Sequence, residues 1–548
     1  MKYNSNPVSR ILRLVSLEKK EITQIYFYAI IYGIIMLVIP VGIQALISFA
    51  QTATISTSVV LLVIFIVLSV FISGVLQVNQ MRIIEKIQQK IFVRYGFGFA
   101  QKIPQLNLSG IDNYYLPELV NRFFDTLTLQ KKIAKLLLDF PLAIVQIIFG
   151  LILLSFYHPV FIAFGLTLIL VVYAILYFSG KKGLVTSIEE STYKYKVVAW
   201  LQEMARIIRS VKFSKSAHFT LQKADEGITG YLQYRTEHFK VLLLQYKTLI
   251  GFKVLVTAAM LSVGTYLMLS QQLTVGQFIA AEIVILTILN SVEKLIVNLD
   301  SVYDVLTAVE KIEQVTDKES EQQGSVLFNA QRNEGISVCI QNLSFGYSGA
   351  DKVINNLSLD AKPGEKICIS GNDGSGKSTL LRLLTGMYDD FEGNILFNDI
   401  PLKNYNLQQL RQKMGVMISQ QDIFEGTLLE NITMGLENPD MEELMHLCKK
   451  TGLAEFISTL KNGFDSPLNT NGRKLSATVV RKILLVRALI NKPALLLLEE
   501  PWHGIETQYQ QQIKTLLLQE MKNTTMFIIS KDADFAAACS KTIHMKNK

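Results

Sequence analysis

The sequence contains little cysteine and little charge. Only four cysteines occur among 548 residues, none of them paired as CxxC, and the six histidines show no metal-ligand spacing. Buried cytosolic thiols are therefore favoured over disulfides or metal ligands. Charged residues make up 18% of the chain and hydrophobic residues 50%. That balance, with a mean hydropathy of +0.30, is typical of a membrane protein.

Long apolar runs occur only in the first 300 residues. Each approaches the roughly 20 residues that an α-helix needs to cross the hydrocarbon core of a bilayer. A charged segment precedes the first run and no small-residue cleavage site follows it, so we expect a retained span rather than a signal peptide. The six predicted spans are Ile25–Ala50, Val59–Val78, Phe140–Tyr157, Val160–Phe178, Val254–Leu269 and Val275–Ile296.

The basic residues indicate how these spans are oriented. The short connectors "QTATISTS" (51–58), "HP" (158–159) and "QQLT" (271–274) contain no Lys or Arg, whereas the N-terminal segment and the long connectors 79–139 and 179–253 are rich in both. Because cytoplasmic loops carry the excess of Lys and Arg, both termini are expected in the cytoplasm of a multi-pass protein of the cell (inner or plasma) membrane. The net charge of +8 then needs no nucleic acid partner.

Glu282 lies within the last predicted span, with Glu293 and Lys294 nearer its inner end. A carboxyl group at membrane depth should face a cavity or a partner rather than lipid. Two interpretations stay open at this point. Glu282 lines a substrate or ion pathway, or it makes an ordinary helix-to-helix contact.

The composition changes after the sixth span. Residues 1–20 form an N-terminal cytoplasmic segment, 21–310 a six-span domain with two long helical connectors, and 311–335 a Glu/Gln/Lys-rich linker. From 336 to 548, short β-branched runs alternate with helical patterns. The predicted fold class is an all-α six-helix transmembrane domain followed by an α/β P-loop ATPase domain.

The prediction of a P-loop ATPase domain rests on a phosphate-binding loop. The expected strand "KICIS" runs into "GNDGSGKST" and then into the helical stretch "LLRLLTGMY". Its glycines let backbone N–H groups approach phosphates closely, Lys377 would reach the β- and γ-phosphates of ATP, and Ser378 would hold Mg²⁺. The nucleotide-binding residues expected from this loop are Gly371, Asn372, Asp373, Gly374, Ser375, Gly376, Lys377, Ser378 and Thr379.

Further motifs follow in a specific order. They are "LSFGY" (343–347), "ISQQDIFEGTLLENI" (418–432), "LSATV" (475–479), "LLLLEE" (495–500), "HGIE" (503–506) and "FIISKD" (527–532). With six preceding spans, the chain resembles the exporter-type ABC half-transporters over nearly its whole length. The stretch "QQLTVGQFIAAEIVILTILNSVEKL" most resembles toxin- and peptide-secretion exporters, with lipid flippases second.

The resemblance implies further site residues. Tyr347 would stack on adenine, Gln420 would sense Mg²⁺ and the attacking water, and Glu500 would be the catalytic carboxylate. Glu499 would join Ser378 and Gln420 at the metal. The resemblance also implies a second half-transporter as partner, identical or different, in which each ATP lies between one subunit's phosphate loop and the other's signature motif.

Several positions depart from the family pattern. The signature LSGGQ is "LSATV", in which Ser476 remains but Ala477, Thr478 and Val479 replace two glycines and a glutamine. Glu499 stands where the family has Asp, so its side chain is one methylene longer than expected. Mg²⁺, which this residue would hold, demands near-ideal coordination geometry. Lys531 stands for a histidine, and as a catalytic residue it would offer charge without an imidazole's geometry. The D-loop, normally small residues and then Asp, is "HGIE".

Two functions remain open from the sequence. The first is a subunit of an ATP-driven exporter of a peptide, toxin or lipid-like substrate, hydrolysing ATP slowly and perhaps paired with a more intact partner. The second is a membrane subunit that binds ATP as a regulatory or structural clamp and hardly hydrolyses it. Misplaced catalytic groups should reduce the rate of phosphoryl transfer more than nucleotide binding, because that chemistry depends on positioning and charge.

Overall fold

The computed structural model describes residues 9, 11, 15–51, 57–110, 116–216, 218–328, 335–347, 351–418, 423–472 and 474–546. The chain divides into two compact units. Unit 1 comprises Met1–Pro104 and Tyr114–Lys318, and unit 2 comprises Gln105–Asn113 and Glu319–Lys548.

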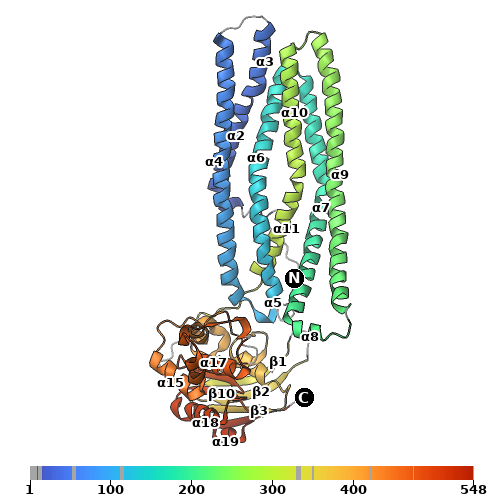
Figure 1. The fold of residues 1–548 in the computed structure, drawn as a ribbon. Coiled ribbons are helices and arrows are strands. Elements are labelled where there is room, and N and C mark those ends of the chain that lie inside the picture. Colours follow the sequence, from blue (N-terminus) through green and yellow to red (C-terminus); the bar gives the residue numbers. More distant parts are fainter. Residues whose placement is uncertain are drawn as a thin grey trace. The chain divides into compact units, whose positions relative to one another are not determined.

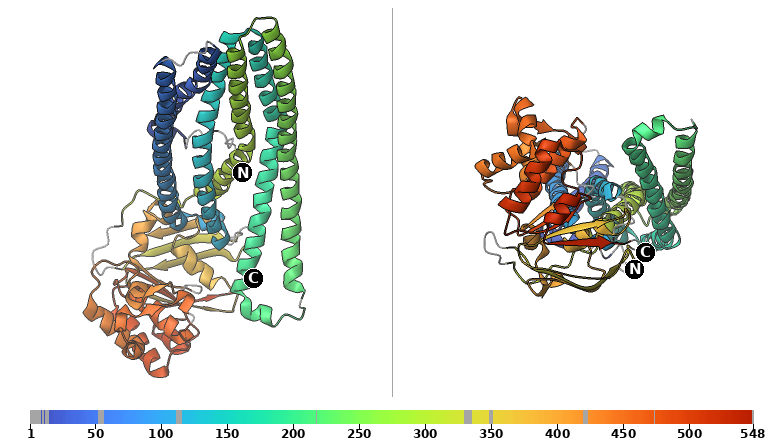
Figure 2. Two further views of the ribbon diagram at one scale, coloured as in Figure 1. Left: turned by 45° about the horizontal axis from the view of Figure 1, so that its top comes forward. Right: turned by 90° about the horizontal axis from the view of Figure 1, so that it is seen from below.

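Unit 1 is built from long helices that run side by side (Figures 1 and 2). Within it α7 packs along α9 and α10 packs along α6. Six helical stretches in the described part of the chain are long and apolar enough to cross a membrane, which confirms the six predicted apolar helices. The helices are α2 (Lys19–Met36), α3 (Val38–Gln51), α4 (Thr57–Lys102), α5 (Leu116–Val120), α6 (Asp125–Tyr157), α7 (Val160–Arg206), α8 (Ile208–Lys212), α9 (Phe219–Leu269), α10 (Val275–Val297) and α11 (Leu299–Thr316).

The first span is interrupted, which the apolar pattern did not predict. Helix α2 ends at Met36 and α3 begins at Val38. Pro40 explains the break, because proline has no N–H to bond the carbonyl four residues earlier yet is tolerated in the first turn of a new helix. The two helices together still form one membrane-spanning stretch.

Large apolar side chains cover the outside of unit 1. Phe71, Phe156 and Leu255 are 68%, 82% and 71% exposed. An apolar surface of this extent in a soluble protein would mark an interaction site, and on six spanning helices it fits lipid chains.

Most polar groups inside the spans have partners. Tyr157 donates a 2.7 Å hydrogen bond to Gln44, and Ser291 donates one of 2.7 Å to Gln146. Glu293 pairs with Lys253. Glu282 on α10 is half-buried and has no hydrogen bond or ion pair within the described residues.

Unit 2 contains an antiparallel and a parallel sheet. The antiparallel sheet has the order β2-β1-β4-β5 and the parallel sheet β11-β3-β10-β9-β6. The strands are β1 (Val338–Phe345), β2 (Ile354–Ala361), β3 (Lys366–Gly371), β4 (Glu392–Phe397), β5 (Ile400–Pro401), β6 (Met414–Met417), β7 (Gly426–Thr427), β8 (Pro467–Leu468), β9 (Leu495–Glu499), β10 (Thr525–Ile529) and β11 (Lys541–Met545). The helices are α12 (Lys377–Leu384), α13 (Leu407–Arg411), α14 (Leu428–Thr433), α15 (Met441–Thr451), α16 (Leu453–Thr459), α17 (Ala477–Leu489), α18 (Thr507–Thr515) and α19 (Ala533–Ala538). This α/β arrangement confirms the predicted fold class of the C-terminal part.

The parallel sheet positions the candidate site. Strand β10 lies between β3 and β9, with Ile529 opposite both Ile369 and Glu499. The four leucines Leu495–Leu498 are fully buried, so the chain first meets solvent at the end of β9. The loops after β3, β9 and β10 therefore leave the same edge of the sheet, where open α/β sheets bind ligands.

A short piece of the first long connector belongs to unit 2. Within that unit, Leu106 pairs with Ser320 as an isolated β-bridge. Asn107 Nδ2 donates to both carboxylate oxygens of Asp389 at 3.3 Å, and Ser109 Oγ donates to the same carboxylate. The periodicity of the connector predicted continuous helix here and gave no sign of this attachment.

Candidate nucleotide-binding site

The loop between β3 and α12 has the backbone that a phosphate cradle requires. Gly371, Gly374 and Gly376 adopt φ values of 140°, 83° and 88°, which L side chains rarely reach. A Cβ on Gly371 would lie 2.2 Å from the carbonyl oxygen of Met545. Lys377 Nζ donates to the carbonyls of Gly371 at 2.9 Å and Asn372 at 2.5 Å. The lysine thus lies over the loop whose phosphate it would bind.

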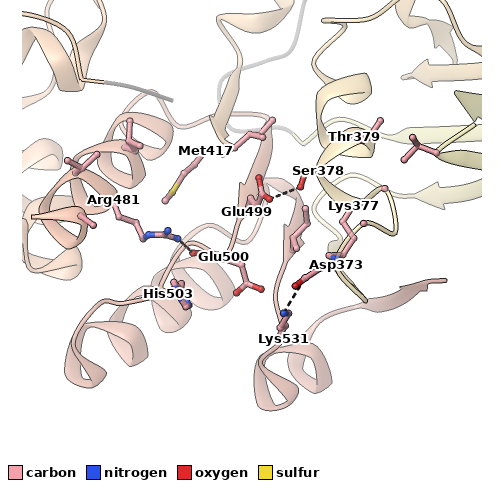
Figure 3. Close-up of a pocket in the computed structure, with 18 of the residues that line it drawn as sticks. Asp373, Lys377, Ser378, Thr379, Met417, Arg481, Glu499, Glu500, His503 and Lys531 are labelled. Carbon is pink, nitrogen blue, oxygen red and sulfur yellow. Dashed lines mark hydrogen bonds and ion pairs between the residues drawn. The ribbon is translucent and has the colours of Figure 1, made fainter. Parts of the chain in front are cut away.

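A hydroxyl and a carboxylate meet at the start of α12. Ser378 Oγ donates a 2.6 Å hydrogen bond to Glu499 Oε1 at the end of β9 (Figure 3). Oxygen donors of these two kinds suit Mg²⁺, which is usually held by one or two protein ligands together with substrate phosphates. No cluster of three or more His, Cys, Asp or Glu suited to a metal occurs in the described part of the chain.

Glu500 has a strained backbone that several contacts hold in place. Its φ is +45°, a left-handed conformation unusual for glutamate. Its N–H donates to the carbonyl of Ile529 at 2.9 Å. Its own carbonyl accepts from Arg481 Nη1 at 2.7 Å and from the N–H of His503 at 3.2 Å. Strain retained by surrounding contacts is a mark of functional sites.

The environment of Glu500 also shifts its acidity. Burial raises the pKa of the Glu500 carboxyl above its ordinary value, and the positive charges of His503, Lys531 and Arg481 oppose that rise. The neighbouring carboxylate of Glu499 raises the pKa further. A carboxyl group with a raised pKa in a cleft is suited to accept a proton.

These groups border a single cleft of about 1030 Å³ in unit 2. A cleft of this size is large enough for a nucleotide. Of the residues expected from the sequence, Asp373, Gly374, Gly376, Lys377, Ser378, Thr379, Glu499, Glu500 and Lys531 line it.

The remaining expected residues differ in position. Gly371, Asn372 and Ser375 belong to the loop without lining the cleft. Tyr347 lies beside Phe345 and Tyr388 with its hydroxyl 3.2 Å from Thr379 Oγ1, also outside the lining. Gln420 lies outside the described residues.

Family comparisons agree with this architecture. The family model described as ABC transporter transmembrane region matches residues 22–292. The family model described as ABC transporter matches residues 354–503. Together they match well over half of the chain. The chain belongs to the ABC transporters.

The curated relatives and the solved structure that this ABC transporter resembles include flippases and exporters. It is 33% identical over 222 residues to an ATP-dependent lipid A-core flippase of Pseudomonas aeruginosa, covering 40% of this chain and 36% of that one. It is 23% identical over 462 residues to the lactococcin-G-processing and transport ATP-binding protein LagD of Lactococcus lactis, covering 83% and 65%. The chain thus spans about a third to two thirds of the length of these curated relatives.

The fold comparison covers more of the molecule. A bacterial Atm1-family ABC exporter with ATP bound matches with a TM-score of 0.83 and 18% identity, over 97% of this chain and 94% of that chain. At that identity the likeness establishes the fold alone, which is that of an exporter half-transporter.

The stretch "LSATV", where the resemblance places the signature motif, is bonded to the stretch "HGIE", where it places the D-loop. Ser476 caps α17, accepting from the N–H of Val479 at 3.2 Å. Thr478 Oγ1 donates to the carbonyl of Gly504 at 2.9 Å. Lys482, which is buried, pairs with Glu506 at 2.7 Å. Helix α17 and the stretch "HGIE" are therefore joined by a hydrogen bond and an ion pair.

Lys531 is directed at the phosphate loop. Its Nζ lies 3.4 Å from Asp373 Oδ1, and the two side chains are 68% and 89% exposed. Exposed pairs of this kind contribute little stability, so Lys531 can reorient at low cost.

Two basic residues that line this cleft, Arg481 and His503, were not predicted from the sequence (Figure 3). His503 begins the stretch "HGIE" and Arg481 follows "LSATV" by two residues, and this proximity to the motifs was the available signal. Their approach to Glu500 depends on the left-handed turn at that residue, which no spacing rule reveals.

Proposed function

We propose that this chain is one half of an ATP-driven exporter that hydrolyses ATP slowly. The observation that carries the proposal is the convergence of Lys377, Ser378, Glu499 and Glu500 on one cleft at the carboxyl edge of the parallel sheet. The chain has both a spanning domain and this ATPase domain, as expected if hydrolysis drives movement across the membrane.

The residues of the cleft divide the work of ATP hydrolysis. The loop from Gly371 to Thr379 would hold the phosphates through backbone N–H groups and the N-terminus of α12. Ser378 and Glu499, with Gln420, would hold Mg²⁺, whose charge offsets that of the phosphates when it is bound. Glu500 would orient the attacking water and accept its proton, which its raised pKa favours. Tyr347 and Ser476 would contact the nucleotide as the family resemblance implies.

Slow turnover follows from the geometry around these groups. Ser378 Oγ donates to Glu499 Oε1 at 2.6 Å, so both groups would have to exchange this partner when Mg²⁺ binds. Lys531 bonds to Asp373 rather than to Glu500. The exposed Lys531 can reorient at low cost, so the expected slowing would come mainly from Glu499, because transition-state stabilisation depends on groups that need no rearrangement.

A second half-transporter would complete the machine. We propose a dimer, either with an identical chain or with a more intact partner, with both termini in the cytoplasm. In either dimer, at least one ATP site would face "LSATV", so every arrangement carries the altered signature motif.

The substrate would pass along α10. Helix α10 carries the half-buried Glu282, and an ionisable group at membrane depth is unsuited to lipid contact. We propose that Glu282 lines the transport pathway. A peptide, a toxin or a lipid-like molecule with a positive group would suit an unpaired carboxylate, and Glu282→Gln should then reduce transport without altering ATP binding.

Isothermal titration of the detergent-purified full chain with MgATP tests the proposal. Binding should be measurable at millimolar ATP and should be lost in Lys377→Ala, because that ammonium would contact the phosphates. Equal binding by native protein and Lys377→Ala would contradict the proposal. Phosphate release then separates the exporter from an ATP-binding clamp, since a clamp would bind ATP without turnover.

A further inference from the structure

The turn after β9 presents a histidine beside the candidate catalytic carboxylate. Trp502 is buried against Phe535, with ring centroids 4.6 Å apart, and Gly504 follows with a φ of +73°. Between them His503 donates its N–H to the carbonyl of Glu500 at 3.2 Å. Its side chain is exposed to the cleft. The buried tryptophan therefore fixes a turn that directs an imidazole into the site.

Figure 3 shows the carboxylate of Glu500 between His503 and Lys531. The side chains of His503 and Lys531 differ in their hydrogen-bond partners. Lys531 pairs with Asp373 on the phosphate loop, whereas the His503 imidazole has no hydrogen bond to another side chain within the described residues. The imidazole is therefore available to the carboxylate.

We infer that His503 orients the Glu500 carboxylate, supplying from the D-loop the imidazole that this chain lacks at position 531. The inference rests on the proposed ATP hydrolysis and concerns the same cleft. His503 is a positioning residue here, because it acts through Glu500. In this role an imidazole N–H would donate to the carboxylate and hold it toward the water, and no covalent bond to His503 would form or break.

The chemistry of the two side chains supports this assignment. A lysine ammonium is a compact charge on a flexible stem, whereas imidazole is a planar group with one donor and one acceptor at neutral pH. A protonated His503 would lower the pKa of Glu500, as Lys531 and Arg481 do, against the effect of burial. Glu499 is the other charged group facing Glu500, and it acts in the opposite direction.

The test compares His503→Ala, His503→Gln and the double variant His503→Ala with Lys531→His. Each full-length protein is purified in detergent and measured for phosphate release, ATP affinity and ADP trapped by orthovanadate. We expect His503→Ala to lower turnover and trapping by about tenfold or more, as for lost proton-transfer geometry. ATP affinity should stay within about twofold of native, because ATP binding and catalysis depend on different groups here. His503→Gln should retain part of the activity, and Lys531→His should restore it.

The matched control is His446→Ala, which removes an exposed histidine of α15 that pairs with Glu520. That variant should behave as the native protein. Native trapping and turnover in His503→Ala would overturn the inference, and so would failure of Lys531→His to restore the double variant. A parallel loss of ATP affinity would also overturn it, since it would assign His503 to binding or folding. If the native protein itself traps no ADP, the proposed hydrolysis fails, which is a distinct result.

Discussion

Replacing Arg481 should slow catalysis while leaving nucleotide binding intact. Arg481 Nη1 donates a 2.7 Å hydrogen bond to the carbonyl of Glu500, whose φ is +45°. A hydrogen bond to a charged group is worth roughly 1.5–3 kcal/mol. The left-handed backbone costs about 1–2 kcal/mol. Without the guanidinium, Glu500 should relax toward an ordinary conformation and its carboxylate should leave the water site.

The size of the effect follows from these energies. If the whole hydrogen-bond energy is lost from the transition state, turnover falls by about ten- to hundredfold, since 1.36 kcal/mol is a factor of ten. Arg481→Met is the test variant because methionine keeps part of the apolar stem. Arg481→Lys is its matched control, since it retains a cation and one donor. Phosphate release gives turnover and isothermal titration gives ATP affinity.

The outcome is decided by the two measurements together. We expect Arg481→Met to lose turnover, Arg481→Lys to lose less, and both to bind ATP as the native chain does. Turnover within about twofold of native in Arg481→Met would refute the reasoning, because a lost bond of that energy exceeds such a change. Equal losses of turnover and affinity would show that Arg481 supports folding rather than Glu500.

Three further predictions concern charge, metal and topology. Lys531→Met should move the acid limb of the pH–rate profile to higher pH, because the lysine charge lowers the pKa of Glu500 and the active form of Glu500 is ionised. Lys531→Arg keeps the charge and should leave the profile unchanged. An unmoved acid limb in Lys531→Met would contradict this prediction. Glu499→Asp should lower the Mg²⁺ concentration for half-maximal phosphate release, since the shorter side chain leaves room for the ion; a higher requirement would contradict it. A cysteine at Gln272 should react with an impermeant thiol reagent outside intact cells and one at Ser214 should not; the reverse pattern would invert the topology.

The sequence predicted those parts of the fold that depend on local pattern. The run "LLLLEE" predicts a buried strand ending in two carboxylates, because such a strand reaches solvent only at its end. The glycines and Lys377 predict the phosphate loop because few backbones can surround a phosphate. The six apolar runs predict six spanning stretches because lipid imposes their length.

The remainder depends on contacts between distant residues. The approach of Arg481 to Glu500 requires α17 to pack beside the end of β9, and no periodicity encodes that packing. The pairing of Lys531 with Asp373 depends on adjacent loops of the parallel sheet. The attachment of Asn107 to Asp389 joins positions 282 residues apart in the chain. Such contacts are properties of the assembled unit, so sequence spacing could not predict them.

The most direct test of the central claim is phosphate release by the full chain, purified in detergent, with Glu500→Gln beside it. The account predicts measurable release at a rate below about 1 s⁻¹, the lower end of typical enzyme turnover. That release should disappear in Glu500→Gln while ATP binding persists. Release that is the same in native protein and Glu500→Gln would contradict the claim that this cleft hydrolyses ATP through Glu500.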